Sequence, residues 1–214
     1  MHRIAAIARA TQTRKVTRIQ REKTDVILAA ALKVFSAEGF RGATIDQIAR
    51  EAEISKPNIL YYFDGKAAIH AALLNDILET WLEPLERLDA AGDPVEELLA
   101  YVLLKLDMAR DYPMQSRLFA HEVMNGAPRI LGELEGPLRK LVEEKAHLVQ
   151  SWVDSGRLAP VEPRHLFFMI WASTQHYSDF EVQVAAISPG QDRAARFDEA
   201  KTHLEAMFRR MLTP

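Results

Sequence analysis

Residues 44–63 read TIDQIAREAEISKPNILYYF, and this stretch predicts two short helices joined by a tight turn. Thr44 is suited to cap the first helix, which we expect to reach about Ala52, and Ser55 is suited to cap the second, which we expect to end near Phe63. Apolar residues recur at helical spacing in both segments, so each helix has one face to pack against the other. The pattern is typical of a helix-turn-helix, whose second helix fits the major groove of duplex DNA.

The outward positions of the second helix are the candidates for contact with base pairs. Lys56 and Asn58 suit the edges of guanine and adenine, and Pro57 offers an apolar surface to a thymine methyl group. Backbone N–H groups at the helix N-termini and tyrosine hydroxyls suit phosphates. The predicted DNA contacts are therefore Thr44, Ser55, Lys56, Pro57, Asn58, Tyr61, Tyr62 and Lys66. The alternative is a helical hairpin in an ordinary bundle, with both tyrosines packed on its surface.

The chain before this motif is basic. Residues 1–23 hold seven lysines and arginines against one glutamate, although the whole chain has a formal net charge of −3. This asymmetry indicates that one end of the molecule meets a polyanion. Organelle transit peptides share the composition, but we favour a disordered basic arm over residues 1–23.

Helical periodicity continues through the rest of the chain, and no stretch alternates with a period of two residues. We therefore predict an all-α protein. A first helix is expected over 25–38, capped by Thr24 and stopped by Gly39. Further helices are expected over about 66–88, where Pro84 bends or ends the helix, and over 138–155, 163–186 and 193–212. The helix-turn-helix head, residues 24–66, is then a three-helix unit joined without a linker to a helical body over 67–214.

Missing residue types and motifs restrict the class of protein. The chain has no cysteine, which excludes disulfides and thiolate zinc sites and is compatible with a reducing cytoplasm. Its longest apolar runs are too short to cross a bilayer. The sequence has no metal-ligand spacing, Gly-rich phosphate loop or nucleophile motif, so we expect no enzyme, no cofactor and no metal. A helical scaffold that does not bind DNA is the remaining rival class.

Three segments of the head resemble the DNA-binding domain of the TetR family of repressors, namely ALKVFSAEGF (31–40), TIDQIA (44–49) and SKPNILYYF (55–63). The resemblance implies a repressor that binds a palindromic operator as a homodimer. Two positions depart from the family pattern. Glu53 stands in the turn where glycine is usual, and we expect it at positive φ at a cost of about 1 kcal/mol. Gly65 stands where a capping serine is common, which leaves Asp64 as a substitute cap.

Segments of the body resemble a pyrimidine-responsive subfamily of the same family: LNDILETWLEPL (74–85), KLDMARDYPMQSRLFAHEVMNGAP (105–128) and LFFMIWASTQHYSDF (166–180). The resemblance implies uracil or thymine as the effector, bound among the body helices. An amide side chain offers the donor and acceptor that match a pyrimidine edge. The residues expected to bind the effector are Trp171, Gln175, Trp81, Leu78 and Arg117, with His121 as an alternative to Arg117. The alternatives are a partner for Gln175 inside the protein and a different effector, such as a larger apolar compound.

An apolar stripe marks the last predicted helix, where Phe197, Leu204, Met207, Phe208 and Met211 recur at helical spacing. The family resemblance implies dimerisation through the last two helices. In such a dimer, two second helices about 34–36 Å apart read successive major grooves. Packing within the same chain is the alternative for any one of these residues. The expected partners are therefore operator DNA, a pyrimidine and a second copy of the chain.

Overall fold

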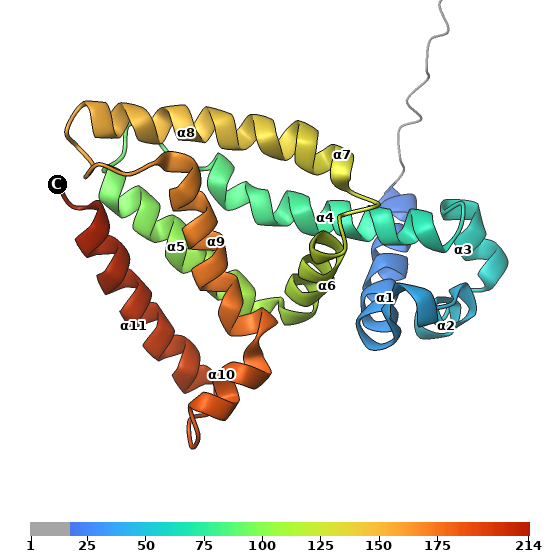
Figure 1. The fold of residues 1–214 in the computed structure, drawn as a ribbon. Helices are drawn as coiled ribbons and strands as arrows, with labels where there is room; N and C mark the ends of the chain where they lie inside the picture. Colours follow the sequence, from blue (N-terminus) through green and yellow to red (C-terminus); the bar gives the residue numbers. More distant parts are fainter. Residues whose placement is uncertain (1–17) are drawn as a thin grey trace, which may run out of the picture.

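The computed structural model describes residues 18–214, and every regular element in this range is helical, as predicted. A small head, a long helix leaving it and a larger body follow one another in space (Figure 1). The elements are α1 (Arg18–Gly42), α2 (Ile45–Glu51), α3 (Lys56–Tyr62), α4 (Lys66–Glu86), α5 (Pro94–Asp111), α6 (Pro113–Met124), α7 (Leu131–Glu133), the π-helical turn η1 (Leu134–Leu138), α8 (Arg139–Asp154), α9 (Pro163–Asp179), α10 (Glu181–Ile187) and α11 (Arg193–Leu212).

The head is held together by apolar side chains from α1, α2, α3 and the start of α4. Phe35, Ile48, Ile59 and Ile69 are at most 1% exposed and belong to one cluster. Thr44 caps α2 as predicted, since its hydroxyl accepts a hydrogen bond from the N–H of the third helical residue at 3.2 Å. That residue's amide oxygen accepts in return from the N–H of Thr44 at 2.8 Å. The reciprocal pair fixes where α2 begins.

Helix α1 begins earlier than predicted. Residues 18–23, which we assigned to a disordered arm, are helical, and Thr24 lies inside the helix rather than at its cap. Arg18 pairs with Glu22 one turn later at 2.7 Å, a spacing that supports a helix even where its residues are polar. Residues 1–17, the rest of the predicted arm, lie outside the described residues. The predicted stop is confirmed, because Gly39 leaves the helical conformation (φ 65°, ψ 173°).

The turn between α2 and α3 contains Glu53 at φ 54°, which confirms the positive φ expected there. Replacing Glu53 with glycine should raise the free energy of unfolding by about 0.5–1 kcal/mol. Glycine adopts this conformation without a steric cost, and its larger entropy in the unfolded chain offsets only part of the gain. Chemical denaturation of the two proteins measures the difference. The control is Arg50→Gly, at an exposed position inside α2, which should lower stability by about 1 kcal/mol. A loss of stability in Glu53→Gly would contradict a strained turn.

Helix α4 connects the head to the body. It begins after Gly65, which has φ 126°, and no side chain caps its first turn, so the prediction that Asp64 acts as the cap is wrong. The helix continues through Pro84 to its end at Glu86. Figure 1 shows α4 leaving the head and running into the body below α8. One continuous helix thus joins the two parts of the molecule and is able to carry a displacement from the body to the head.

The body core lies among α5, α8, α9 and α11 (Figure 1). Leu98, Val102 and Phe167 are completely buried there because each helix contributes an apolar face. The helix predicted over 163–186 is in fact divided at Phe180 into α9 and α10. The spacing of apolar residues does not register this break, because both halves remain helical.

The apolar stripe of α11 faces the core of its own chain. Phe197, Leu204 and Phe208 are at most 4% exposed and pack in the body core. The prediction that they form a dimer contact is wrong for these three residues, because they have almost no surface left for a second chain. Met207 and Met211 are only half-buried and line a surface depression on α11, so they stay predicted dimer contacts.

Candidate functional site

Helix α3 presents a polar edge to solvent. Ser55, Lys56, Pro57 and Asn58 are all exposed, whereas Ile59 is fully buried in the head cluster. The buried side anchors α3, and the exposed side carries the groups that we predicted to contact base pairs. Their arrangement follows from the sequence, because one apolar residue per turn is enough to orient so short a helix.

Lys56 and Asn58 differ in their present contacts. The Nζ of Lys56 lies 2.8 Å from Oδ2 of Asp46 in an exposed ion pair, whereas the amide of Asn58 has no hydrogen-bond partner among residues 18–214. An exposed ion pair contributes about 0–1 kcal/mol. Lys56 can therefore leave Asp46 and bind DNA at a small cost in free energy. Asn58 has no contact to break before it binds DNA.

The other residues predicted to contact DNA differ in their exposure and in the hydrogen bonds that they already form. Tyr61 is 65% exposed, and its ring packs edge-on against half-buried Tyr62 with centroids 5.1 Å apart. The hydroxyl and N–H of Thr44 are both engaged with Gln47. Ser55 precedes α3 without a side-chain cap bond, so its hydroxyl is free to donate. Tyr61 and Ser55 are thus better placed than Tyr62 and Thr44 for a phosphate.

The side chain of Lys66 forms hydrogen bonds inside the protein. Its Nζ donates to the carbonyl oxygens of Phe40 and Ala43, both at 2.7 Å, and lies 4.7 Å from the centroid of the Phe40 ring. These bonds satisfy carbonyls at the end of α1 and tie them to the first residue of α4. The phosphate contact predicted for Lys66 rested on backbone N–H groups at the N-terminus of α4, which these side-chain hydrogen bonds do not involve, so it stays a prediction.

A cavity of about 340 Å³, called the body cavity below, lies among α4, α5, α6, η1 and α9. Four of the five predicted ligand residues line it, and the full lining comprises Leu78, Trp81, Leu82, Lys105, Phe119, Ala120, Val123, Met124, Leu134, Leu138, Trp171 and Gln175. Sequence segments up to about 100 residues apart thus meet here as the resemblance implied. The lining is largely apolar, so its few polar groups decide what the cavity accepts.

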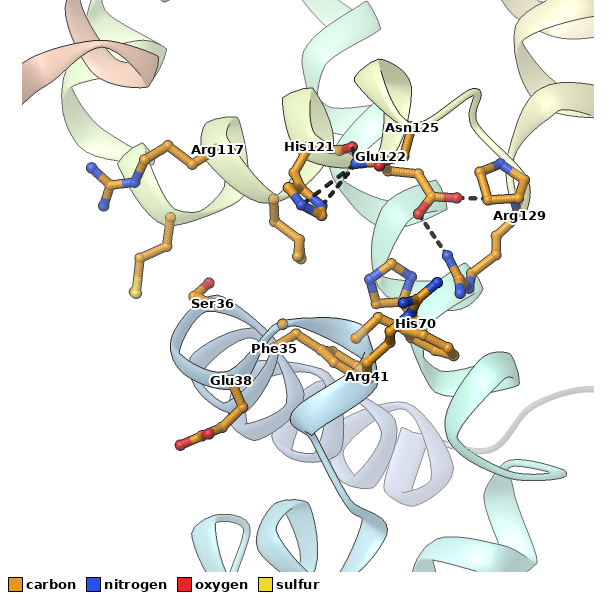
Figure 2. Close-up of a pocket in the computed structure, with 15 residues that line it drawn as sticks. Phe35, Ser36, Glu38, Arg41, His70, Arg117, His121, Glu122, Asn125 and Arg129 are labelled. Carbon is orange, nitrogen blue, oxygen red and sulfur yellow. Dashed lines mark hydrogen bonds and ion pairs between the residues drawn. The ribbon is translucent and has the colours of Figure 1, made fainter.

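Arg117 and His121 do not reach the body cavity. Both line a second cavity near the head (Figure 2), and the exposed Arg117 lies 3.5 Å from Glu181. The prediction that they help to bind a ligand beside Trp171 is therefore wrong. Both residues lie on α6, but on a face turned away from Phe119 and Val123, which do line the body cavity.

Trp171 is held in place by its indole nitrogen. Its Nε1 donates a 2.7 Å hydrogen bond to the hydroxyl of Tyr101, and its ring stacks on Phe167 with an interplanar angle of 17°. Burial raises the pKa of Tyr101 to about 12, so this hydroxyl stays protonated at neutral pH. The indole is thereby fixed as one wall of the cavity before any ligand arrives.

Gln175 lies one helical turn after Trp171 and also lines the cavity. It is half-buried, and its amide forms no hydrogen bond with any residue between 18 and 214. The partner inside the protein that we considered as an alternative is therefore not present among the described residues. The amide remains available as one donor and one acceptor for a bound molecule.

Lys105 is a cavity residue that the sequence analysis missed. It is 3% exposed, makes no ion pair within residues 18–214, and places its Nζ 4.1 Å from the centroid of the Trp81 ring. Burial lowers the pKa of this ammonium to about 7. The available signal was a single lysine inside the apolar run LLAYVLLKL (98–106), where it must either reach solvent or be buried at a cost.

Lys105→Met should raise the free energy of unfolding by about 1–4 kcal/mol at pH 6, because it removes a buried cation that no carboxylate compensates. The pKa of Lys105 is about 7 in the folded protein and 10.5 in the unfolded chain, so the unfolded chain binds more protons between these pH values. Wild-type stability should therefore rise with pH across this range, and the advantage of the variant should shrink by pH 10. Denaturation at pH 6, 8 and 10 tests this. Equal free energies of unfolding for the wild type and Lys105→Met at pH 6 would contradict a buried charge without a compensating partner.

Within residues 18–214, no cluster of three or more histidine, aspartate or glutamate side chains is arranged to hold a metal ion. None of the helices described is both long enough and apolar enough to span a membrane.

Comparison with known proteins matches both parts of the chain to family models. Residues 27–73 match the model of bacterial regulatory proteins of the tetR family, and residues 74–214 match that of the YcdC-like protein C-terminal region. The HTH-type transcriptional regulator RutR of Escherichia coli strain K12 is 48% identical over 176 residues, which cover 82% of this chain and 83% of that protein. The HTH-type transcriptional repressor NicS of Pseudomonas putida is 34% identical, covering 62% and 68%. These relatives are transcriptional regulators and not enzymes.

Solved structures share the fold at low sequence identity. The ketosteroid transcriptional regulator KstR2 of Mycobacterium tuberculosis has a TM-score of 0.69 at 17% identity, covering 90% of this chain and 95% of that one. A putative fatty acid metabolism regulator of Clostridium perfringens has a TM-score of 0.64 at 21% identity, covering 85% and 97%. The likeness confirms the predicted arrangement of a helix-turn-helix head on a helical body.

Proposed function

The chain belongs to the TetR family of bacterial regulatory proteins, and from this premise we propose that it is a repressor which uracil or thymine releases from a palindromic operator. It is a transcriptional regulator of the TetR type, related to RutR. The observation that supports the pyrimidine is the pair of polar side chains, Gln175 and Lys105, that line the body cavity without a hydrogen-bond partner among residues 18–214.

The chemistry of the body cavity matches a pyrimidine. Uracil and thymine are flat rings whose edges alternate carbonyl acceptors with N–H donors. The amide of Gln175 can pair with one carbonyl and the adjacent N–H, and the ammonium of Lys105 can donate to a carbonyl. Trp81 and Trp171 supply aromatic faces for a planar ring. The resemblance of the body to pyrimidine-responsive regulators, stated above, points to the same class of ligand.

A larger apolar effector is the alternative, and two features of the cavity disfavour it. Its volume of about 340 Å³ is near the lower end of the roughly 300–1,000 Å³ found for ligand sites. An apolar molecule would also leave Gln175 and Lys105 buried without partners, at a cost of about 1–3 kcal/mol for an unpaired polar group. The cavity therefore favours a small ligand with carbonyl groups.

Helix α4 links the body cavity to DNA binding. Leu78 and Trp81 line the cavity from the body half of α4, and Lys66 at its other end is bonded to the carbonyls that end α1. A ligand that moves the α4 wall of the cavity would thus move the head. TetR regulators bind operator DNA and form dimers, so such a movement changes the separation of two heads. The required difference in ligand affinity between the two arrangements is about 1–3 kcal/mol.

On the DNA side, the exposed edge of α3 is the surface we assign to base pairs. Lys56 and Asn58 would contact guanine and adenine edges, and Pro57 a thymine methyl group, with Ser55 and Tyr61 at phosphates. Of the apolar residues predicted on the last helix, Met207 and Met211 remain the proposed dimer contacts. Phe168 and Met169 on α9 are 51% and 38% exposed and add apolar surface that a second chain can cover.

Isothermal titration calorimetry with uracil, thymine, cytosine and adenine tests the effector. Uracil or thymine should bind once per chain. Cytosine, which replaces one carbonyl by an amino group, should bind more weakly, and adenine should not bind measurably. Equal binding of all four bases, or of none, would contradict the proposal, and tight binding of a long apolar compound instead would support the alternative.

A further inference from the structure

A second cavity of about 770 Å³, called the junction cavity below, lies where the head meets the body. Figure 2 shows its two sides: the end of α1 below, with Phe35 and Arg41, and α6 above, with His121 and Asn125. His70 of α4 lies between them. The junction cavity shares no lining residue with the body cavity, so the two cavities are separate sites.

The charged side chains around the junction cavity that lack a strong ion pair are mainly arginines. Glu122 is 3% exposed, and both its carboxylate oxygens are taken by Arg129, one by the guanidinium at 2.8 Å and one by the backbone N–H at 2.9 Å. The guanidinium of Arg41 forms no hydrogen bond or ion pair within residues 18–214. Arg117 has only a 3.5 Å contact with Glu181, which Arg193 shares at 3.2 Å. Glu38 is the one further acid in the lining, and it lies on the exposed side of α1.

His70 adds a buried polar group that the protein leaves unsatisfied. The residue is 2% exposed and lines the cavity, and its Nδ1 has no hydrogen-bond partner among the described residues. Burial and then the positive charge of Arg129 lower its pKa to about 4, so the ring is neutral at pH 7. A neutral imidazole can donate one hydrogen bond to a bound group, and leaving a buried polar atom unpaired is costly.

The remaining walls are apolar. Phe35 and Leu118 are 1% and 8% exposed, and Met114 completes this side. Arg129 lies with its guanidinium carbon 3.5 Å from the centroid of the Phe40 ring, held there by Glu122. The cavity therefore combines fixed and free guanidinium groups with a hydrophobic floor, which is the chemistry that holds a carboxylate attached to an apolar body.

We propose that the junction cavity binds a small organic carboxylate with an apolar body, whose carboxylate is held by Arg41 and Arg129 and whose body packs against Phe35 and Leu118. This site is independent of the pyrimidine proposed for the body cavity. Because its walls come from both the head and the body, its occupant contacts both parts of the molecule at once.

Benzoate is a suitable probe, with benzamide as its neutral counterpart of the same shape. Calorimetry on the full chain should show one benzoate per chain with a dissociation constant below about 1 mM, and benzamide binding at least about tenfold more weakly. Arg41→Gln should weaken benzoate binding by about tenfold or more, because a hydrogen bond to a charged group is lost. This exposed residue lies outside the head cluster, so the variant is expected to fold.

Two controls place the bound probe. Arg87→Gln removes an exposed arginine at the far end of α4 and should leave benzoate affinity unchanged. Lys105→Met removes the cation of the body cavity and should also leave it unchanged. Binding that survives Arg41→Gln but is lost in Lys105→Met would place benzoate in the body cavity and overturn the proposal. No binding, or equal binding of benzamide, would overturn it as well, whereas failure of uracil to bind would leave it standing.

Discussion

Asn58→Ala is expected to lower the affinity for the operator by about 10- to 100-fold. A bidentate contact between an asparagine and an adenine edge contributes about 1–3 kcal/mol of discrimination, and 1.4 kcal/mol corresponds to a factor of ten. The side chain of Asn58 is exposed on α3 and unpaired within residues 18–214, so it gives up no contact when it meets DNA. Lys56→Ala should cost less, since breaking the ion pair with Asp46 offsets part of its gain. Fluorescence anisotropy with a labelled operator duplex measures both.

The control for this prediction is a duplex of scrambled sequence. Asn58→Ala should leave its weak, salt-dependent binding nearly unchanged, because phosphate contacts carry no sequence information. The variant should also bind uracil like the wild type. An equal loss on both duplexes would mean that Asn58 contributes to general attraction or to folding, and would remove it from the set of base contacts.

Gln175→Ala is expected to weaken uracil binding by about 10- to 100-fold while operator affinity stays unchanged. Two hydrogen bonds to the pyrimidine edge are lost, each worth about 0.5–1.5 kcal/mol net. Gln175 is far in sequence from the head and makes no hydrogen bond within residues 18–214, so its removal disturbs no contact that positions α3. Calorimetry gives the ligand affinity, and anisotropy gives the operator affinity.

A matched control is Gln183→Ala, which removes an exposed glutamine from α10 and should affect neither measurement. Lys105→Met should weaken uracil binding as Gln175→Ala does, although it raises stability. Full uracil response in Gln175→Ala would show that the body cavity does not bind the pyrimidine through this amide. Loss of operator binding in the same variant would show that the residue serves the fold.

The parts of the structure that sequence predicted well are those determined by neighbours along the chain. The cap at Thr44, the break at Gly39 and the positive φ of Glu53 each depend on a few adjacent residues. The apolar spacing within 44–63 likewise predicted that Ser55, Lys56, Pro57 and Asn58 are exposed, although it wrongly placed Leu60, which is 44% exposed, on the packed side. Trp171 and Gln175 were predicted together because i and i+4 share a helix face, and both line the body cavity.

The parts that sequence could not predict depend on contacts between distant segments. The ammonium group of Lys66 donates hydrogen bonds to the carbonyls of Phe40 and Ala43, which lie far earlier in the chain. No local sequence pattern reveals such partners. Periodicity showed that α11 has an apolar face but not that α5 of the same chain packs against it, which is why Phe197 was misassigned. Arg117 was predicted to bind the ligand of the body cavity, although its own side of α6 faces the junction cavity.

In the proposed mechanism, occupation of the body cavity releases the head from a specific DNA sequence. Its most direct test is operator binding by fluorescence anisotropy at physiological salt, with and without saturating uracil or thymine, using adenine and a scrambled duplex as controls. The protein should bind the operator selectively, and the dissociation constant of this complex should rise about 5- to 150-fold with a pyrimidine but not with adenine. Equal, purely salt-controlled binding of both duplexes, indifferent to pyrimidine, would contradict it.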